Sequence, residues 1–128
     1  SFLVKHLRIN WTEGEKHFRN CLLDFNKANN VAQWQWVAGC GADAAPFFRI
    51  FNPILQGEKF DKEGLYVKKW VPELDRVPQK FIHKPWEMEL KYQQAINTIV
   101  GKDYPKPIVI HEEARASALK AFQTLRKN

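Results

Sequence analysis

The sequence has few of the residues on which small proteins commonly build metal or hydrolytic sites. Its two cysteines, Cys21 and Cys40, are too few for a disulfide framework and lack the Cys-x-x-Cys spacing. The four histidines show no metal-ligand spacing, and no Ser, Thr or Cys lies in a recognisable nucleophile motif. The glycines occur singly, so no glycine-rich loop can cradle a phosphate. We therefore expect no metal and no nucleophilic hydrolysis.

Long apolar runs are missing as well. Lys, Arg or Asn interrupts every apolar stretch well before the roughly 18 residues that indicate a membrane span. The first residues show no signal-peptide pattern. With so few cysteines, these features predict a soluble, cytoplasmic protein that has no membrane partner.

What the sequence does contain is positive charge, aromatic residues and helical periodicity. Its 128 residues permit one domain, and the net charge of +6 indicates either a polyanionic partner or simply a basic surface. The chain begins without Met, and the apolar residues of 2–7 follow helical spacing. We expect the chain to start inside a helix and to be a piece of a longer protein.

Apolar residues at helical spacing predict an all-α fold. A helix is expected from about 12 to 23, with Thr12 as N-cap and Glu15 completing a capping box. Asn29 or Asn30 is expected to cap the next helix, which ends at Gly39.

Shorter helices are expected in the second half of the chain. They should cover about 53–60, 65–70, a segment opened by Pro85, and 111–126. An irregular loop containing Pro46 is expected over 41–51, and an extended connection from Val77-Pro78 to Lys84-Pro85. Only residues 108–110 read as a strand.

The segment Trp34-Gln35-Trp36 is the most informative motif. Residues two apart on a helix point about 200° apart, so one indole can face the interior while the other faces a cleft. Several further blocks follow in a fixed order, and together they cover most of the chain. These blocks are Ser1-Phe2-Leu3-Val4-Lys5, Asn29-Asn30, Phe47-Phe48-Arg49-Ile50-Phe51-Asn52-Pro53, Gln56-Gly57-Glu58-Lys59-Phe60-Asp61, Trp70-Val71-Pro72-Glu73-Leu74 and Ile82-His83-Lys84-Pro85-Trp86.

As a set, these blocks resemble the C-terminal part of the FAD-binding domain of the cyclobutane-pyrimidine-dimer DNA photolyases, in the photolyase/cryptochrome family. The resemblance implies that residues 1–128 are a C-terminal fragment of this multi-helical catalytic domain. It implies light-driven repair of DNA containing pyrimidine dimers, by electron transfer from reduced FAD. The isolated chain is expected to be inactive. An antenna chromophore would be bound by a domain outside it.

The resemblance also implies roles for individual residues. Trp34 and Trp11 match two members of the family's electron-transfer chain. Trp36 matches the residue that stacks on the flipped dimer, while Arg49 and Gln56 match positions near the lesion and its DNA. Stacking on an aromatic face is what an extruded base requires.

The candidates for FAD binding are short polar residues around the start of the second helix. An isoalloxazine edge carries one donor and several acceptors, which such side chains can pair. Where the family has Asp-x-Asp, this sequence reads Asp24-Phe25-Asn26, which removes one negative charge near the flavin. Asn29 and Asn30 complete the set.

Several alternatives remain open. Trp70 and Trp86 are expected to be core residues, Arg49 can instead pair with an acidic neighbour, and Gln56 can be an ordinary surface residue. As a whole, the chain can belong to a photosensory, cryptochrome-like flavoprotein without repair activity. Asn26, at the position of the family's second Asp, keeps this alternative open. It can also be a flavin-free helical module that binds DNA or another partner.

A fragment of a helical domain should expose apolar surface. The chain contains five Trp, three Tyr and nine Phe, so that surface would be large. We expect the fragment to self-associate, whereas the full-length protein is expected to be a monomer.

Overall fold

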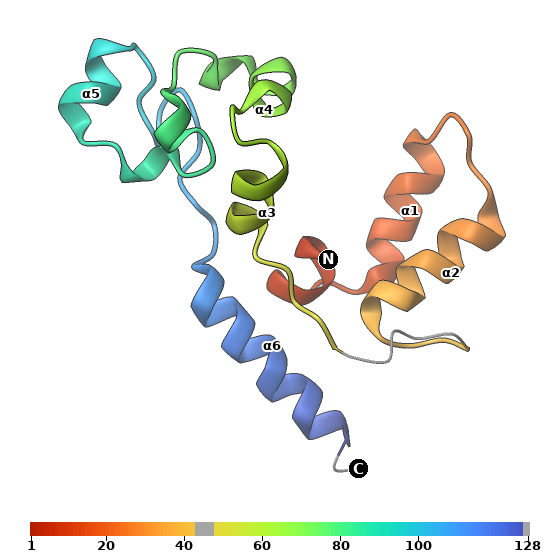
Figure 1. Cartoon of the computed structure of the whole chain (residues 1–128). Coiled ribbons are helices and arrows are strands. Elements are labelled where there is room, and N and C mark those ends of the chain that lie inside the picture. Colours follow the sequence, from red (N-terminus) through yellow and green to blue (C-terminus); the bar gives the residue numbers. More distant parts are fainter. Residues whose placement is uncertain (43–47, 127–128) are drawn as a thin grey trace. The chain divides into compact units, whose positions relative to one another are not determined.

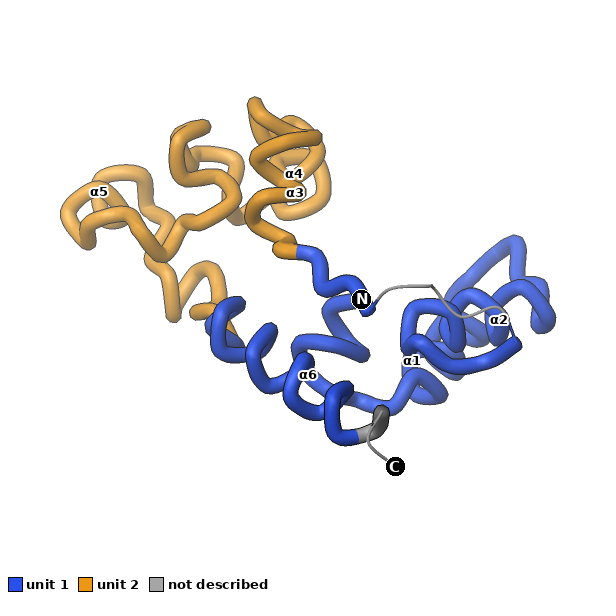
Figure 2. The backbone as a smooth tube through the Cα atoms, turned by 60° about the horizontal axis from the view of Figure 1, so that its bottom comes forward, with its two compact units in different colours: residues 1–51, 109–128 blue, residues 52–108 orange. Residues whose placement is uncertain are grey.

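The computed structural model describes residues 1–42 and 48–126. Within these residues every regular element is a helix (Figure 1). The one β-type contact in this part of the chain is an isolated bridge between Val100 and Tyr104. The chain divides into two compact units, residues 1–51 with 109–128 and residues 52–108 (Figure 2). None of the described helices is long and apolar enough to cross a membrane. The all-α prediction is therefore confirmed.

The first unit is built from four helical segments. It contains the π-helix η1 (Phe2–His6), α1 (Trp11–Cys21), α2 (Lys27–Ala38) and α6 (His111–Arg126). Helix α1 packs along α2, and η1 contacts α1, α2 and α6. Helix η1, near the beginning of the chain, and helix α6 thus belong to the same packed unit.

The helix caps in this unit differ from those expected. Helix α1 is capped by Asn10, whose Oδ1 accepts from the backbone N–H of Thr12, so Thr12 is not the N-cap. Helix α2 is capped by Asn26, whose Oδ1 accepts from Asn29 N at 3.0 Å. The prediction of Asn29 or Asn30 as cap is wrong because α2 begins earlier. Its predicted end is confirmed, with Gly39 in the left-handed conformation that glycine tolerates.

Two histidines connect η1 to the start of α6. His6 is buried, and its Nε2 lies 2.9 Å from Nδ1 of His111, the first residue of α6. Phe2 stacks on the His6 ring with centroids 5.2 Å apart. Burial lowers the pKa of His6 below its ordinary value of 6.5, and the neighbouring His111 lowers it further.

We expect the first unit to lose stability on acidification. Because the pKa of folded His6 is depressed, the unfolded chain binds more protons between that pKa and 6.5. The contribution of His6 to the stability of the folded unit is therefore complete above its pKa in the unfolded chain. It is lost as the pH falls through its pKa in the folded unit. Hydrogen exchange of α6 amides in the full-length protein, between about pH 7.5 and about pH 5.5, should show faster opening at acid pH. His6→Asn should flatten this dependence, and an unchanged profile would contradict the assignment.

The second unit combines short helices and turns. Its α-helices are α3 (Pro53–Phe60), α4 (Leu65–Trp70) and α5 (Leu90–Ala95). Between α4 and α5 lie the 3₁₀ turns η2 (Pro72–Leu74), η3 (Gln79–Phe81) and η4 (Pro85–Glu87). The predictions of helices at 53–60 and 65–70 are confirmed.

At the start of both α3 and α4, a side chain accepts hydrogen bonds from backbone N–H groups of the first turn. Asn52 Oδ1 accepts from the N–H groups of Ile54 and Leu55 at the start of α3. The Asp61 carboxylate accepts from Tyr66 N and Val67 N at the start of α4. These hydrogen bonds lower the pKa of Asp61 despite an opposing desolvation effect.

The core of the second unit is small. It consists of Leu74, Val77, Ile82 and Met88, each at most 3% exposed. All four side chains come from turns rather than from long helices. The unit therefore depends on a few apolar contacts between tightly turned segments.

Three expectations for this half of the chain are wrong. The connection from Val77 to Pro85 is not extended, because η3 and turns occupy it. Residues 108–110 form no strand, since no partner segment pairs with them among the described residues. Trp70 is 63% exposed and Trp86 36% exposed, so neither is a core residue here.

One further expectation is wrong, and another is only partly tested. Pro85 begins the short turn η4 rather than a longer helix, and α5 follows separately. The irregular loop expected over 41–51 lies partly outside the described residues, as does Pro46. Both units expose large apolar side chains, such as Leu23, Phe60 and Leu65, while self-association stays a prediction.

Candidate functional site

The two indoles of the Trp34-Gln35-Trp36 segment have different surroundings. Trp34 is half-buried and packs on α1, with its ring edge-on to Phe18 at a centroid distance of 5.1 Å and an interplanar angle of 76°. Trp36 lies on the same helix but is 41% exposed. The expectation that the two rings point to different sides of α2 is confirmed. One indole is thus placed for contacts inside the unit and the other for contacts outside it.

Trp11 lies on the same surface of α1 that receives Trp34. It is the first residue of α1 and is half-buried. The residue one turn later, Gly14, contacts the Trp34 indole directly, and positions three apart on a helix are neighbours on one face. The structure therefore brings the two predicted electron-transfer residues onto one helix pair.

A buried polar network joins α1 and α2 beside these indoles. Glu15 is 4% exposed, and its carboxylate accepts from the Arg19 guanidinium at 2.6 Å and 3.2 Å. Asn30, 7% exposed, donates its Nδ2 to the Glu15 carbonyl at 3.0 Å and to Oε1 at 3.2 Å. Glu15 was expected only as a capping-box residue. Its i,i+4 spacing from Arg19 is the sequence signal that could have revealed the ion pair.

This network fixes the orientation of the Asn30 amide. Because Nδ2 is directed at Glu15, the amide oxygen Oδ1 is left without a hydrogen-bond donor among the described residues. Among the described residues, His6 Nδ1 is the only fully buried side-chain N or O atom that lacks a hydrogen-bond partner. Asn30 Oδ1, which also lacks a donor, is therefore not fully buried. Asn30 can therefore accept a hydrogen bond from a group outside the described residues.

The other flavin candidates lie at the connection between α1 and α2. Asp24 is exposed, Phe25 is half-buried, and Asn26 and Asn29 are exposed. Asn26 Oδ1 is occupied by the cap of α2. Its Nδ2 and the Asp24 carboxylate have no partners within residues 1–42 and 48–126. A donor and an acceptor are thus available together, which fits the edge of an isoalloxazine ring.

Arg49 is exposed, and its guanidinium lies over the Phe51 ring, 5.2 Å from the centroid. Its backbone carbonyl accepts a hydrogen bond from the buried Lys5 ammonium. Burial, and then the Arg49 charge, lower the pKa of Lys5. Arg49 forms no ion pair in the described part of the chain, so its charge is available to an anionic ligand.

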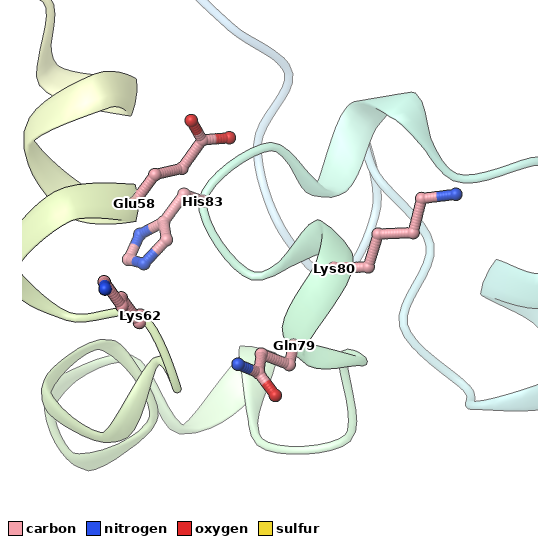
Figure 3. Close-up of a pocket in the computed structure, with 5 residues that line it drawn as sticks. All are labelled: Glu58, Lys62, Gln79, Lys80 and His83. Atoms are coloured by element: carbon pink, nitrogen blue, oxygen red, sulfur yellow. The ribbon is translucent and has the colours of Figure 1, made fainter.

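Gln56 belongs to the second unit and is exposed on α3. A pocket of about 390 Å³ in that unit is lined by Glu58, Lys62, Gln79, Lys80 and His83 (Figure 3). His83 Nε2 lies 2.7 Å from the Asp61 carbonyl oxygen, and Glu58 pairs with Lys84 at 3.2 Å. None of the lining residues is Phe, Tyr or Trp, so the pocket lacks an indole or phenyl face for stacking a base.

Neither metal nor disulfide chemistry has a structural basis in the described residues. They contain no group of three or more His, Cys, Asp or Glu side chains that could hold a metal ion. Cys21 and Cys40 are both free and exposed. The polar and aromatic residues of α1, α2 and their connection remain the strongest candidate site.

Comparisons with known proteins identify the family of the chain. A family model described as the FAD binding domain of DNA photolyase matches residues 1–124. The deoxyribodipyrimidine photo-lyase of Agrobacterium fabrum is 56% identical over 99% of this chain, which spans 26% of that protein. The crystal structure of a class III photolyase from Agrobacterium tumefaciens superposes with a TM-score of 0.92, at 55% identity over 99% of this chain and 26% of that one.

A Synechocystis cryptochrome structure is also similar, with a TM-score of 0.86 and 36% identity over 93% of this chain and 24% of that chain. The chain thus spans about a quarter of the length of these relatives. The match covers both helical units and almost every described residue. The chain belongs to the family of the FAD-binding domain of DNA photolyases.

Proposed function

We propose that this chain is part of a longer photolyase that repairs cyclobutane pyrimidine dimers in DNA under light, using reduced FAD. The observation that carries the proposal is the division of the two indoles, with Trp34 packed on α1 against Gly14, one turn from Trp11, and Trp36 exposed on α2. A repair enzyme of this kind needs an aromatic face for its substrate, and a pair of indoles would return its flavin to the reduced state. The three indoles that would serve these purposes lie on α1 and α2.

FAD would be held by residues at the connection between α1 and α2. Asp24 and Asn26 offer an unpaired carboxylate and an unpaired amide N–H among the described residues. Asn29 lies in the first turn of α2, and Phe25 supplies a half-buried ring. When bound in its reduced form, FAD supplies the excited-state electron that opens the cyclobutane ring.

Asn30 would accept a hydrogen bond at the flavin edge. Its amide N–H groups are held by Glu15, so only its oxygen is free to face a donor. The half-exposed Arg19 guanidinium, in turn, holds the buried Glu15 carboxylate in place. In this proposal Asp24, Asn26 and Asn30 orient the flavin, while Asn26 in place of a carboxylate changes the local charge.

The DNA side of the site would be formed by Trp36 and Arg49. Gln56, an exposed residue of the second unit, would also contact DNA. The exposed Trp36 ring can stack on the extruded dimer, and the unpaired Arg49 cation can contact a phosphate. A net charge of +6 favours association with a polyanion. The antenna chromophore would be bound by another part of the longer, monomeric, cytoplasmic protein.

The alternative is a cryptochrome-like flavoprotein without repair activity. The likeness to a cryptochrome structure and the amide at Asn26 support it. Trp36 favours repair, because an exposed indole is a strong stacking surface for a flipped base. A flavin-free DNA-binding module has no specific observation in its favour.

The test is Trp36→Ala in the full-length protein, assayed on an oligonucleotide with a single thymine dimer. Base–aromatic stacking contributes about 1–3 kcal/mol, so affinity for the dimer should fall about five- to hundredfold. Binding is measured by fluorescence anisotropy and repair by dimer loss under blue light. Flavin absorption should not change, because Trp36 is on the exposed side of α2.

Trp86→Ala serves as the matched control, since its indole is similarly exposed at 36% but lies in the second unit. It should leave dimer affinity unchanged. If the wild-type protein binds FAD but shows no dimer repair, the cryptochrome-like alternative is correct. If Trp36→Ala binds and repairs as well as wild type, Trp36 has no part in the substrate site.

A further inference from the structure

We propose that Gly14 is a positioning residue for electron transfer: by lacking a side chain, it determines how closely the Trp34 indole approaches α1 and Trp11. This inference rests on the proposed role of Trp34 and Trp11 as electron carriers. Neither the family match nor the resemblance in the sequence assigns a role to Gly14. The evidence is the packing between α1 and α2.

The contact at Gly14 is too close for any other residue. A Cβ built on Gly14 would lie 2.1 Å from Trp34 Cη2, 2.4 Å from Cζ3 and 2.6 Å from Cζ2. These three atoms form the outer edge of the indole, so the ring reaches the backbone of α1. Real Cβ atoms essentially never come within 3.0 Å of a heavy atom outside their own stretch of backbone. Alanine at this position therefore requires the indole or a helix to move.

The cost of glycine in a helix supports a specific role. Gly14 lies inside α1 and is buried, where glycine disfavours the helix relative to alanine because of its backbone entropy. Its φ angle is not positive, so no left-handed conformation requires glycine here. Close approach of the indole is the remaining physical reason for it.

Contacts on α1 and between the two helices restrict the movement of the indole. Phe18, four residues after Gly14 on the same helix, meets the indole edge-on, with ring centroids 5.1 Å apart. Asn30, one turn before Trp34 on α2, is hydrogen-bonded to Glu15. The two helices are thus fixed beside Gly14, and an added methyl group would displace the ring rather than the helices.

Displacement of the ring should change electron transfer between the indoles. Trp11 lies three residues before Gly14, on the same face of α1. Electron tunnelling falls steeply with edge-to-edge separation, so even a small outward movement of Trp34 should slow transfer from Trp11. Flavin binding should be retained, because Gly14 is not among the polar residues assigned to it.

The experiment compares four full-length variants with wild type: Gly14→Ala, Trp34→Phe, the double variant and Gly57→Ala. Gly57 is a matched control, because it too lies inside a helix and its added Cβ would meet His83 Nδ1 at 2.4 Å. Flavin reduction under blue light is followed by absorption. We expect a severalfold slower rate for Gly14→Ala, an unchanged rate for Gly57→Ala, and a Tm lowered in both.

The stability cycle gives a readout that does not depend on flavin chemistry. Gly14→Ala should lower the Tm when Trp34 is present, but should leave it unchanged or raise it in Trp34→Phe, where the smaller ring makes room and alanine favours the helix. An equal decrease in both backgrounds would overturn the packing argument.

The two proposals fail in different ways. If Trp34→Phe leaves flavin photoreduction intact, the electron-transfer role of Trp34 is wrong, and the role of Gly14 in it is wrong as well. If Trp34→Phe removes photoreduction while Gly14→Ala matches wild type, only the positioning role is overturned.

Discussion

Full-length protein carrying Trp34→Phe is expected to lose most of its light-driven flavin reduction while still repairing dimers when its flavin is reduced chemically. Phenylalanine is much harder to oxidise than tryptophan, so it cannot relay an electron from Trp11. Repair itself uses an electron already on the reduced flavin and does not need the relay. Measuring photoreduction by absorption and repair after dithionite treatment separates the two steps.

The effect should be specific to the position of Trp34. Trp70→Phe is the control, because the Trp70 ring is 63% exposed in the second unit and has no assigned role. It should reduce and repair like wild type. If Trp34→Phe instead loses repair with chemically reduced flavin, Trp34 acts on flavin binding or substrate rather than on electron supply.

Leu74→Ala is expected to destabilise the second unit by about 2–5 kcal/mol. Leu74 is 1% exposed and is one of only four buried apolar residues in that core. Removing it takes a large share of the apolar contacts and leaves a cavity, since the turns around it have few other contacts with which to close. Hydrogen exchange of amides in residues 52–108 measures the opening free energy of this unit within the full-length protein.

Leu65→Ala is the matched control for this prediction. Leu65 is 66% exposed at the start of α4, so its truncation should change stability by no more than about 0.5 kcal/mol. Comparable losses for the two variants would show that the surface around Leu65 is covered in the full-length protein. A negligible loss for Leu74→Ala would contradict the assignment of the core.

Helix locations were well predicted where the apolar spacing was regular. The helices at 53–60, 65–70 and 111–126 match α3, α4 and α6, because each follows a clear start signal or carries one apolar face. Caps were predicted less well. Several Asn and Thr residues near each helix start can cap it, and local sequence does not decide which side chain reaches the free N–H groups.

Residue type alone did not predict the burial of Trp70 and Trp86. Expecting Trp70 and Trp86 in the core followed from the average burial of tryptophan, but both are exposed. The core of their unit instead consists of smaller side chains in tightly turned segments, such as Leu74 and Val77. Which of several apolar residues becomes buried depends on how the turns fold together.

The sequence by itself determined the helical class, the family and the opposite directions of Trp34 and Trp36, because periodicity, motif order and helix geometry are local properties. Tertiary structure alone decided that Trp34 lies against Gly14 and that Asn30 is held by a buried Glu15. These contacts join residues 15 to 20 positions apart. They exist only once α1 and α2 pack, since packing is what removes both the indole and the carboxylate from water.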